Sequence, residues 1–176
     1  MTGTDVAVAP SASAAQLARF LQFGDSMFPV GAFAFSGGLE SAIQKGVVTD
    51  KTTLAAYAHT MVDQAAMGDG IALIWAHRAA ASGDVDELVR IDERVHARKL
   101  SSETRTMTVR MGRKHAELAF DVTAAPIVAA WRARIQAGTT PGCYVVALAV
   151  TFAAQGLTAR DAFVVHQYGV AAMILG

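Results

Sequence analysis

Apolar residues recur along this chain at the spacing of an α-helix, and this spacing constrains the fold more than any other feature. Leu17, Phe20, Leu21 and Gly24 follow the i, i+3, i+4, i+7 rule, and similar patterns return as far as Val170. No long alternating run competes as a strand. The chain is also rich in alanine, with only four prolines, which favours helices. The sequence therefore predicts an all-α domain: a compact bundle of about eight or nine short helices.

Capping and breaking residues give the expected helix boundaries. A short helix is expected over residues 39–45, and a third helix is expected to end at Gly68, with Asp69 opening a fourth. A basic helix should run to about Phe120, and Pro141 should stand in the first turn of an apolar helix that continues through Gln155. The remaining boundary residues are Gly46, Thr49 or Asp50, Gly83, Asp84, Ser101 or Ser102, Pro126, Gly138, Gly156 and Thr158.

Length and targeting signals predict one domain in the cytoplasm. A chain of 176 residues fits a single domain, which we place at residues 14–176 after a flexible tail over residues 1–13. Neither a secretory signal nor an apolar run of about eighteen residues is found, so no membrane association is expected. The single cysteine, Cys143, cannot form an internal disulfide, which fits a reducing compartment, and we expect it to be buried.

Charge is segregated although the net charge is zero. Residues 1–89 hold nine acids against four bases, whereas residues 90–114 hold eight bases against three acids. Asp86 is placed to pair with Arg90, while Arg94 and Arg98 on the same helical face repel each other. The basic stretch is interpreted either as a solvated face or as an arginine-bearing contact surface. Nucleic acid is not an expected partner, because the balance is too mixed.

Catalytic patterns are lacking. The glycine-rich stretch has no Gly-Lys-Ser/Thr ending, so the sequence does not predict a phosphate-binding loop. The five histidines show no His-x-His or His-x-x-x-His pair, so neither a metal site nor an enzyme is expected. A small-ligand or metal-binding helical protein remains the alternative, and a nucleic-acid binder acting through residues 90–114 is a further one.

Residues 25–41 carry a segment that cannot be a long helix. Three phenylalanines alternate there with Pro29 and glycines, so the segment is expected to be a loop that either plugs the core or covers a partner. The stretch resembles the N-terminal signature of the UreF family of urease accessory proteins. The matching residues are Leu21, Asp25, Ser26, Phe28, Pro29, Val30, Gly31, Phe33, Ser36, Gly38, Leu39 and Glu40.

Later segments resemble the same family in the same order. Glu103 and Arg105, and then Met111-Gly112-Arg113, match the Glu-x-Arg and Met-Gly-Arg pattern of its central helix. A glycine in mid-helix is unfavourable, so Gly112 is expected to mark close packing. Residues 141–146, 154–156 and 166–168 resemble the late helices. The resemblance covers residues 17–176, and we expect the family's C-terminal tail, with its Arg-Leu-x-x-Leu-Gly-Gln pattern, to be missing.

The resemblance implies a helical, usually dimeric, non-enzymatic scaffold. Such a chain would join UreD (also called UreH) and the GTPase UreG for nickel delivery to apo-urease, with nickel and GTP handled by the partners and no cofactor bound by the chain itself. We expect the phenylalanines to act as apolar anchors and Arg105 and Arg113 to supply charge-assisted contacts. The expected partner-binding residues are Asp25, Ser26, Phe28, Pro29, Gly31, Phe33, Phe35, Ser36, Gly38, Glu40, Glu103, Arg105, Gly112, Arg113 and Tyr168.

Overall fold

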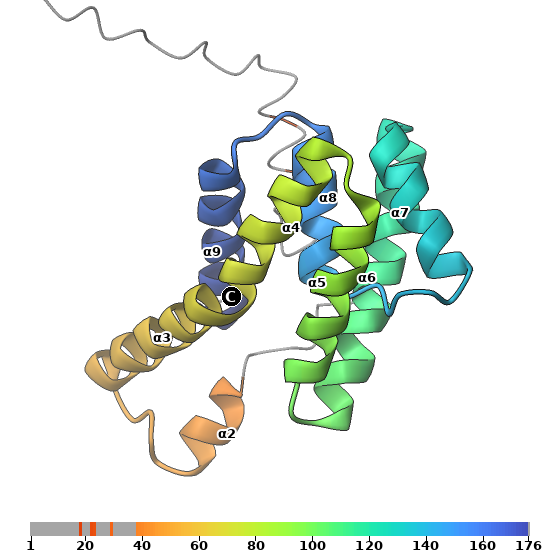
Figure 1. Ribbon diagram of the computed structural model, residues 1–176. Coiled ribbons are helices and arrows are strands. Elements are labelled where there is room, and N and C mark those ends of the chain that lie inside the picture. Colours follow the sequence, from red (N-terminus) through yellow and green to blue (C-terminus); the bar gives the residue numbers. More distant parts are fainter. Residues whose placement is uncertain (1–17, 19–21, 24–28, 30–37, 176) are drawn as a thin grey trace, which may run out of the picture.

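Helices form all of the regular secondary structure in the part of the chain that the structure describes. The computed structural model describes residues 18, 22–23, 29 and 38–175 (Figure 1). In chain order the elements are α2 (Leu39–Gln44), α3 (Lys51–Ala65), the π-helix η1 (Ala66–Gly70), α4 (Ile71–Ser82), α5 (Val85–Arg98), α6 (Ser102–Thr123), α7 (Pro126–Gln136), α8 (Tyr144–Ala154) and α9 (Ala159–Leu175). The predicted all-α class is confirmed. If α3, η1 and α4 are counted as one continuous helix, these residues hold seven helices.

The most apolar helix, α8, forms the centre of the bundle. Eight of its eleven residues, Val145 to Phe152, are buried. α4 and α6 pack most extensively against it, and α7, α9 and α5 complete its surroundings (Figure 1). A helix that is apolar on all sides must be covered on all sides, so this sequence dictates the central position of α8. Cys143, just before it, is fully buried as predicted.

Several predicted caps are present. The Asp50 side chain accepts a hydrogen bond from the Thr53 amide, and the Thr53 hydroxyl accepts one from the Asp50 amide. These two bonds give α3 a reciprocal capping box. Asp84 caps α5 and Ser101 caps α6 by the same side-chain-to-amide contact. Pro126 occupies the first turn of α7, where its missing N–H costs nothing. Local chemistry therefore positions most helix starts.

The predicted break at Gly68 is wrong. The chain continues from α3 through η1 into α4, and a Cβ at Gly68 would meet no neighbouring atom, so no contact there forces a stop. Asp69 does not open a helix. Its carboxylate pairs with Lys99 Nζ, 2.7 Å away, at the end of α5. A tertiary ion pair thus uses the side chain that the sequence suggested as a cap.

Two further predictions need correction. The apolar helix starts at Tyr144 rather than at Pro141, because the amides of Gly142 and Cys143 are bonded to Asp92 instead of facing solvent as a free helix start. Asp86 does not pair with Arg90. Arg134 of α7 bonds its carboxylate, while Arg90 pairs with Glu87 at 2.6 Å.

No helix in the described ranges combines the length and the apolar character that crossing a membrane requires. The predicted tail over residues 1–13 lies outside the described residues.

Candidate functional site

A basic groove runs along α6. It is open to solvent, has a volume of about 630 Å³ and takes most of its lining from one face of that helix, with His96 contributed by α5. Residues three and four apart share a helical face, and this places the cations in a row. The groove's charged lining is Arg105, Arg110, Arg113, Lys114 and Glu117. Four cations against one carboxylate make the groove suited to an acidic ligand or protein surface.

The cations of the groove differ in how far the protein already uses them. Arg105 Nη1 donates to the carbonyl oxygens of Lys99 and Leu100, at 2.6 and 3.2 Å. Arg113 Nε donates to the Pro141 carbonyl at 3.0 Å, and Lys114 lies 3.3 Å from Glu117 with both side chains half exposed. Arg110 is exposed and forms no ion pair with any described residue. Arg105 and Arg113 therefore fasten backbone segments as well as carrying charge.

The Met111-Gly112-Arg113 motif lies where α6 meets the start of α8. A Cβ at Gly112 would stand 2.1 Å from the Gly142 carbonyl oxygen and 2.5 Å from the Cys143 carbonyl carbon. Only glycine allows this approach, so the predicted close packing at Gly112 is confirmed. Gly142 itself has φ +83°, a left-handed conformation that favours glycine.

Asp92 holds the other side of this junction, and sequence analysis missed it. Its fully buried carboxylate accepts hydrogen bonds from the Thr140 hydroxyl (2.7 Å), the Gly142 amide (2.6 Å) and the Cys143 amide (2.8 Å). The signal was available: Asp92 follows Leu88 by four positions, on the buried face of α5. Burial raises the pKa of the Cys143 thiol, and the Asp92 charge adds to the effect, so this cysteine stays protonated.

Three of the five histidines are buried in the core. His77 donates to the Leu157 carbonyl at 2.8 Å, and His115 lies 3.0 Å from the Thr151 hydroxyl, in edge contact with Tyr144. Burial lowers the pKa of His115 to about 3 and also lowers the pKa values of His77 and His166. Within the described ranges, no three His, Cys, Asp or Glu side chains come together as a metal site requires.

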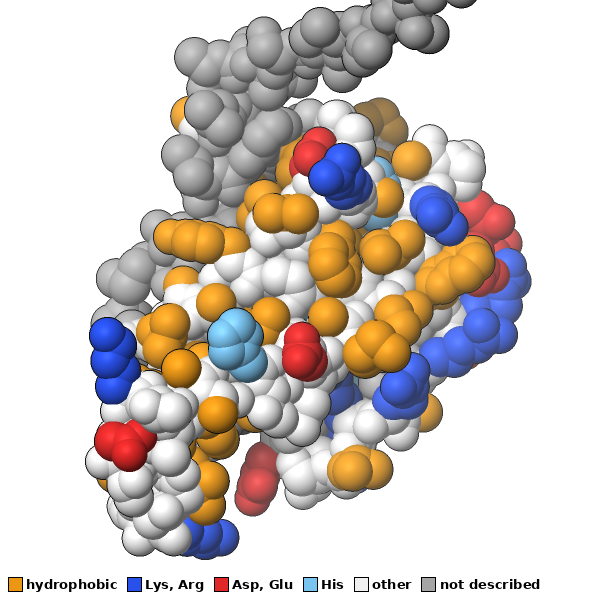
Figure 2. All heavy atoms as spheres, turned by 90° about the vertical axis from the view of Figure 1, so that its left-hand side faces the viewer, with side chains coloured by type: hydrophobic (Ala, Val, Ile, Leu, Met, Phe, Trp, Pro, Cys, Tyr) orange, Lys and Arg blue, Asp and Glu red, His pale blue; other side chains and the backbone are white. Residues whose placement is uncertain are grey.

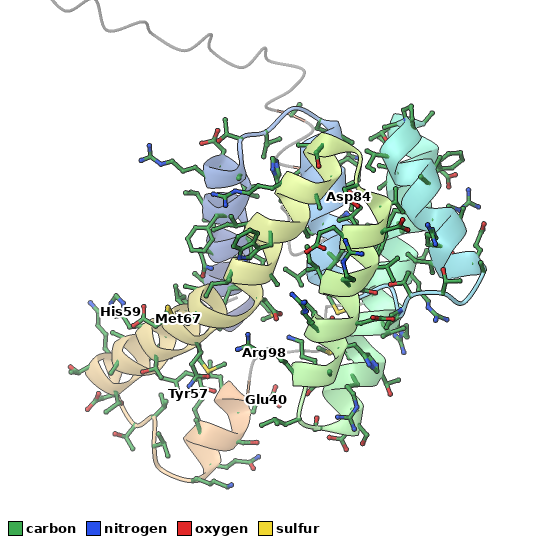
Figure 3. All side chains as sticks on the ribbon, viewed as in Figure 1. Glu40, Tyr57, His59, Met67, Asp84 and Arg98 are labelled. Carbon is green, nitrogen blue, oxygen red and sulfur yellow. The ribbon has the colours of Figure 1, made fainter. Side chains whose placement is uncertain are left out.

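The predicted partner-binding residues fall into separate groups. Seven of them lie outside the described residues: Asp25, Ser26, Phe28, Gly31, Phe33, Phe35 and Ser36. Pro29 is exposed. Gly38 directly precedes α2 and has φ +87°, and a Cβ placed on it would lie 3.3 Å from the Tyr57 hydroxyl oxygen. Glu40 is exposed on α2. Tyr57 points from α3 toward α2, and Arg98 lies on the side of α5 turned toward α2 (Figure 3).

The central helix brings the other predicted residues together. Glu103, Arg105, Gly112 and Arg113 all lie on α6, but only the two arginines line the groove, since Gly112 is buried against the start of α8. Tyr168 lies on α9, away from this group, and is 69% exposed.

Tyr168 belongs instead to a second surface, which sequence analysis did not single out. Met67, Ile71 and Trp75 are exposed at spacings of four residues along η1 and α4, and Val164 and Tyr168 are exposed on α9, which packs beside them. We call these five residues the apolar face. Figure 2 shows hydrophobic side chains gathered over this side of the molecule. The i, i+4, i+8 spacing of Met67, Ile71 and Trp75 was the signal in the sequence.

Comparison with known proteins decides the family. A family model named UreF matches residues 48–176. Curated proteins named "Urease accessory protein UreF" from Yersinia enterocolitica, Yersinia pestis and Yersinia pseudotuberculosis are each 48% identical over 163 residues, which cover 93% of this chain and 72% of each relative. The chain belongs to the UreF family. The predicted resemblance to the UreF family is thereby confirmed, and Gly112 in the Met111-Gly112-Arg113 segment has a packing role in this UreF-family chain.

Proposed function

We propose that this UreF-family chain is a urease accessory protein that acts as a scaffold and not as an enzyme. The observation that carries the proposal is the 48% identity to urease accessory proteins over 93% of the chain. In this proposal the chain bridges UreD (UreH) and the GTPase UreG while nickel is delivered to apo-urease in the cytoplasm. Nickel and GTP are held by the partners, and no cofactor is bound by this chain.

The basic groove and the N-terminal signature are proposed to face these partners. Phe28, Phe33 and Phe35 would supply apolar anchors, and Arg105 and Arg113 would supply positive charge. The presence of both arginines in one groove supports the second half of this proposal. Interfaces of this kind place apolar anchors at the centre and charges around them.

The apolar face is proposed to pair with a second copy of the chain. Large apolar side chains are exposed on helices that pack together, and an exposed apolar patch is typical of a surface that a partner covers. Met67 is 71% exposed and Trp75 is 56% exposed, and several such residues on neighbouring helices are more informative than any one of them alone. A homodimer through this face would leave the groove on α6 free for other partners.

Co-expression with the proposed partners tests the scaffold. A tagged chain should retain both UreD and UreG on an affinity column, and Arg110→Glu in the groove should reduce the amount of partner retained. Lys51→Glu, an exposed charge reversal at the start of α3, is the matched control. Failure of the wild-type chain to retain either protein would contradict the proposal.

A small-ligand or metal-binding protein is the alternative function. Equilibrium dialysis of the isolated chain against nickel separates the two, because tight stoichiometric binding would favour the alternative. The burial of His77, His115 and His166 argues for weak binding, since these rings are packed inside the core.

A further inference from the structure

The turn between α5 and α6 presents one almost fully exposed aliphatic side chain. Leu100 is 96% exposed, more than any other large apolar residue in the described ranges. Isolated exposed leucines are common and need no explanation by themselves. This one differs in the number of contacts that fix the backbone beneath it.

Three side chains immobilise the turn. Arg105 Nη1 donates to the carbonyl oxygens of Lys99 and Leu100. Lys99 Nζ bonds both carboxylate oxygens of Asp69 at 2.7 Å, which ties the turn to η1. Ser101 caps α6 by accepting from the Thr104 amide at 3.0 Å. Because the base of Leu100 is already ordered, its insertion into a pocket would cost little conformational entropy.

The surroundings of Leu100 are positively charged. Residues 94–117 hold seven Lys and Arg against two Glu, a net charge of +5. Ser102, two residues after Leu100, lines the basic groove, and Arg98 stands exposed two residues before Leu100. An apolar side chain that projects from a cationic surface is complementary to an apolar pocket ringed by carboxylates.

We infer that Leu100 and the basic groove form the docking site for a partner protein whose surface offers an apolar pocket with an acidic rim. Arg105 is the positioning residue that holds Leu100 out. This inference rests on the proposed function and deepens it by assigning the contact and its chemistry. A nucleic acid fits the site less well, because contacts to its phosphates would use the cations but leave Leu100 without a pocket.

Substitution of Leu100 tests the anchor. The probes are purified UreD and UreG, each titrated with the full chain. Leu100→Ser should weaken binding to one of them by about thirtyfold or more, the size expected for an interface hot spot. Leu100→Met should bind within about threefold of the wild type, since it keeps an apolar side chain of similar volume. Val122→Ser is the control, because Val122 is an exposed apolar residue at the C-terminal end of α6, the end far from Leu100.

A double-mutant cycle tests the role of Arg105. If Arg105 acts partly through Leu100, Arg105→Ala should weaken binding, and the further loss on adding it to Leu100→Ser should be smaller than the loss that Arg105→Ala causes in the wild type. Hydrogen exchange of the amides of residues 99–101 should become faster in Arg105→Ala and stay unchanged in Leu100→Ser. Fully additive losses, together with unchanged hydrogen exchange of residues 99–101 in Arg105→Ala, would mean that Arg105 acts only through its own charge in the groove and would overturn the positioning role.

The outcomes separate the two levels of the proposal. Wild-type binding that Leu100→Ser leaves unchanged would overturn the docking site while the scaffold function stands. A wild-type chain that binds neither UreD nor UreG would remove the scaffold function and the docking site with it. Salt-sensitive retention on heparin or DNA that is unaffected by Leu100→Ser, without binding to either protein, would assign the groove to nucleic acid instead.

Discussion

At the scale of single residues, buried polar groups decide how the start of α8 is held. Asp92 is fully buried, and three donors from residues 140–143 converge on its carboxylate. A buried carboxylate is tolerated only when donors surround it, and here two of the donors are backbone amides near the positive end of α8. The same residue therefore shapes the junction on which α6 and its groove rest.

Removal of the Asp92 carboxylate should destabilise the protein. Asp92→Ala leaves buried donors without acceptors, so the free energy of unfolding should fall by roughly 3 kcal/mol. Urea unfolding followed by circular dichroism measures the change. Glu93→Ala, at the exposed neighbouring position, should change the free energy by less than about 0.5 kcal/mol. Equal losses in the two variants would contradict the role of Asp92.

The buried histidines should make the protein less stable in acid. Burial lowers the pKa of His115 to about 3 and lowers that of His77 and His166 too. Below about pH 6.5 the unfolded chain takes up protons that the folded chain refuses, so stability falls as pH falls. Each histidine that stays neutral in the folded state lowers the free energy of unfolding by about 1.4 kcal/mol for each pH unit below about 6.5, until its folded pKa is reached.

Urea midpoints at pH 7 and pH 5 measure this dependence. His115→Gln should reduce the difference between the two midpoints, whereas His59→Gln, at an exposed position, should leave the difference as it is in the wild type. A protein whose stability is the same at both pH values would contradict the account.

At the scale of helices, caps could be predicted from the sequence but tertiary contacts could not. Asp50, Asp84 and Ser101 each bond an amide three residues later, so these caps depend only on neighbouring residues and can be predicted from the sequence. The missed features depend on partners far along the chain: Asp69 pairs with Lys99, and Asp92 reaches residues 140–143. For the site, the sequence predicted the arginines of α6 but not the groove, the apolar face or the fixed turn at Leu100.

Glycine at position 112 should be required for the packing of α6 against α8. Gly112→Ala would place a methyl group 2.1 Å from the Gly142 carbonyl oxygen, so it should destabilise the protein by about 2 kcal/mol or more. Gly68→Ala is the matched control, because a Cβ there meets nothing. That substitution should stabilise the protein by roughly 0.5 kcal/mol. Thermal or urea unfolding gives both values, and a tolerated Gly112→Ala would refute the packing role.

At the scale of the whole molecule, the two exposed surfaces have different chemistry. The groove on α6 is basic, whereas the face over η1, α4 and α9 is apolar (Figure 2). Because these surfaces lie on different elements, a scaffold can pair with itself through one and with other proteins through the other.

A charge on the apolar face should prevent self-association. Trp75→Glu should convert the proposed dimer into a monomer, because it buries an unpaired carboxylate in the interface. Light scattering coupled to size exclusion gives the mass directly, and Val122→Glu, outside this face, should leave the mass at that of the wild type. A wild-type chain that is monomeric at tens of micromolar would contradict the dimer.

The central claim is that this UreF-family chain joins UreD and UreG in one assembly. The most direct measurement is the mass of the complex formed when all three are co-expressed, purified and passed over a size-exclusion column with light scattering. We predict one species that contains all three proteins and that does not form when this chain is omitted. Elution of this chain apart from UreD and UreG, or a complex of those two that forms equally well without it, would contradict the claim.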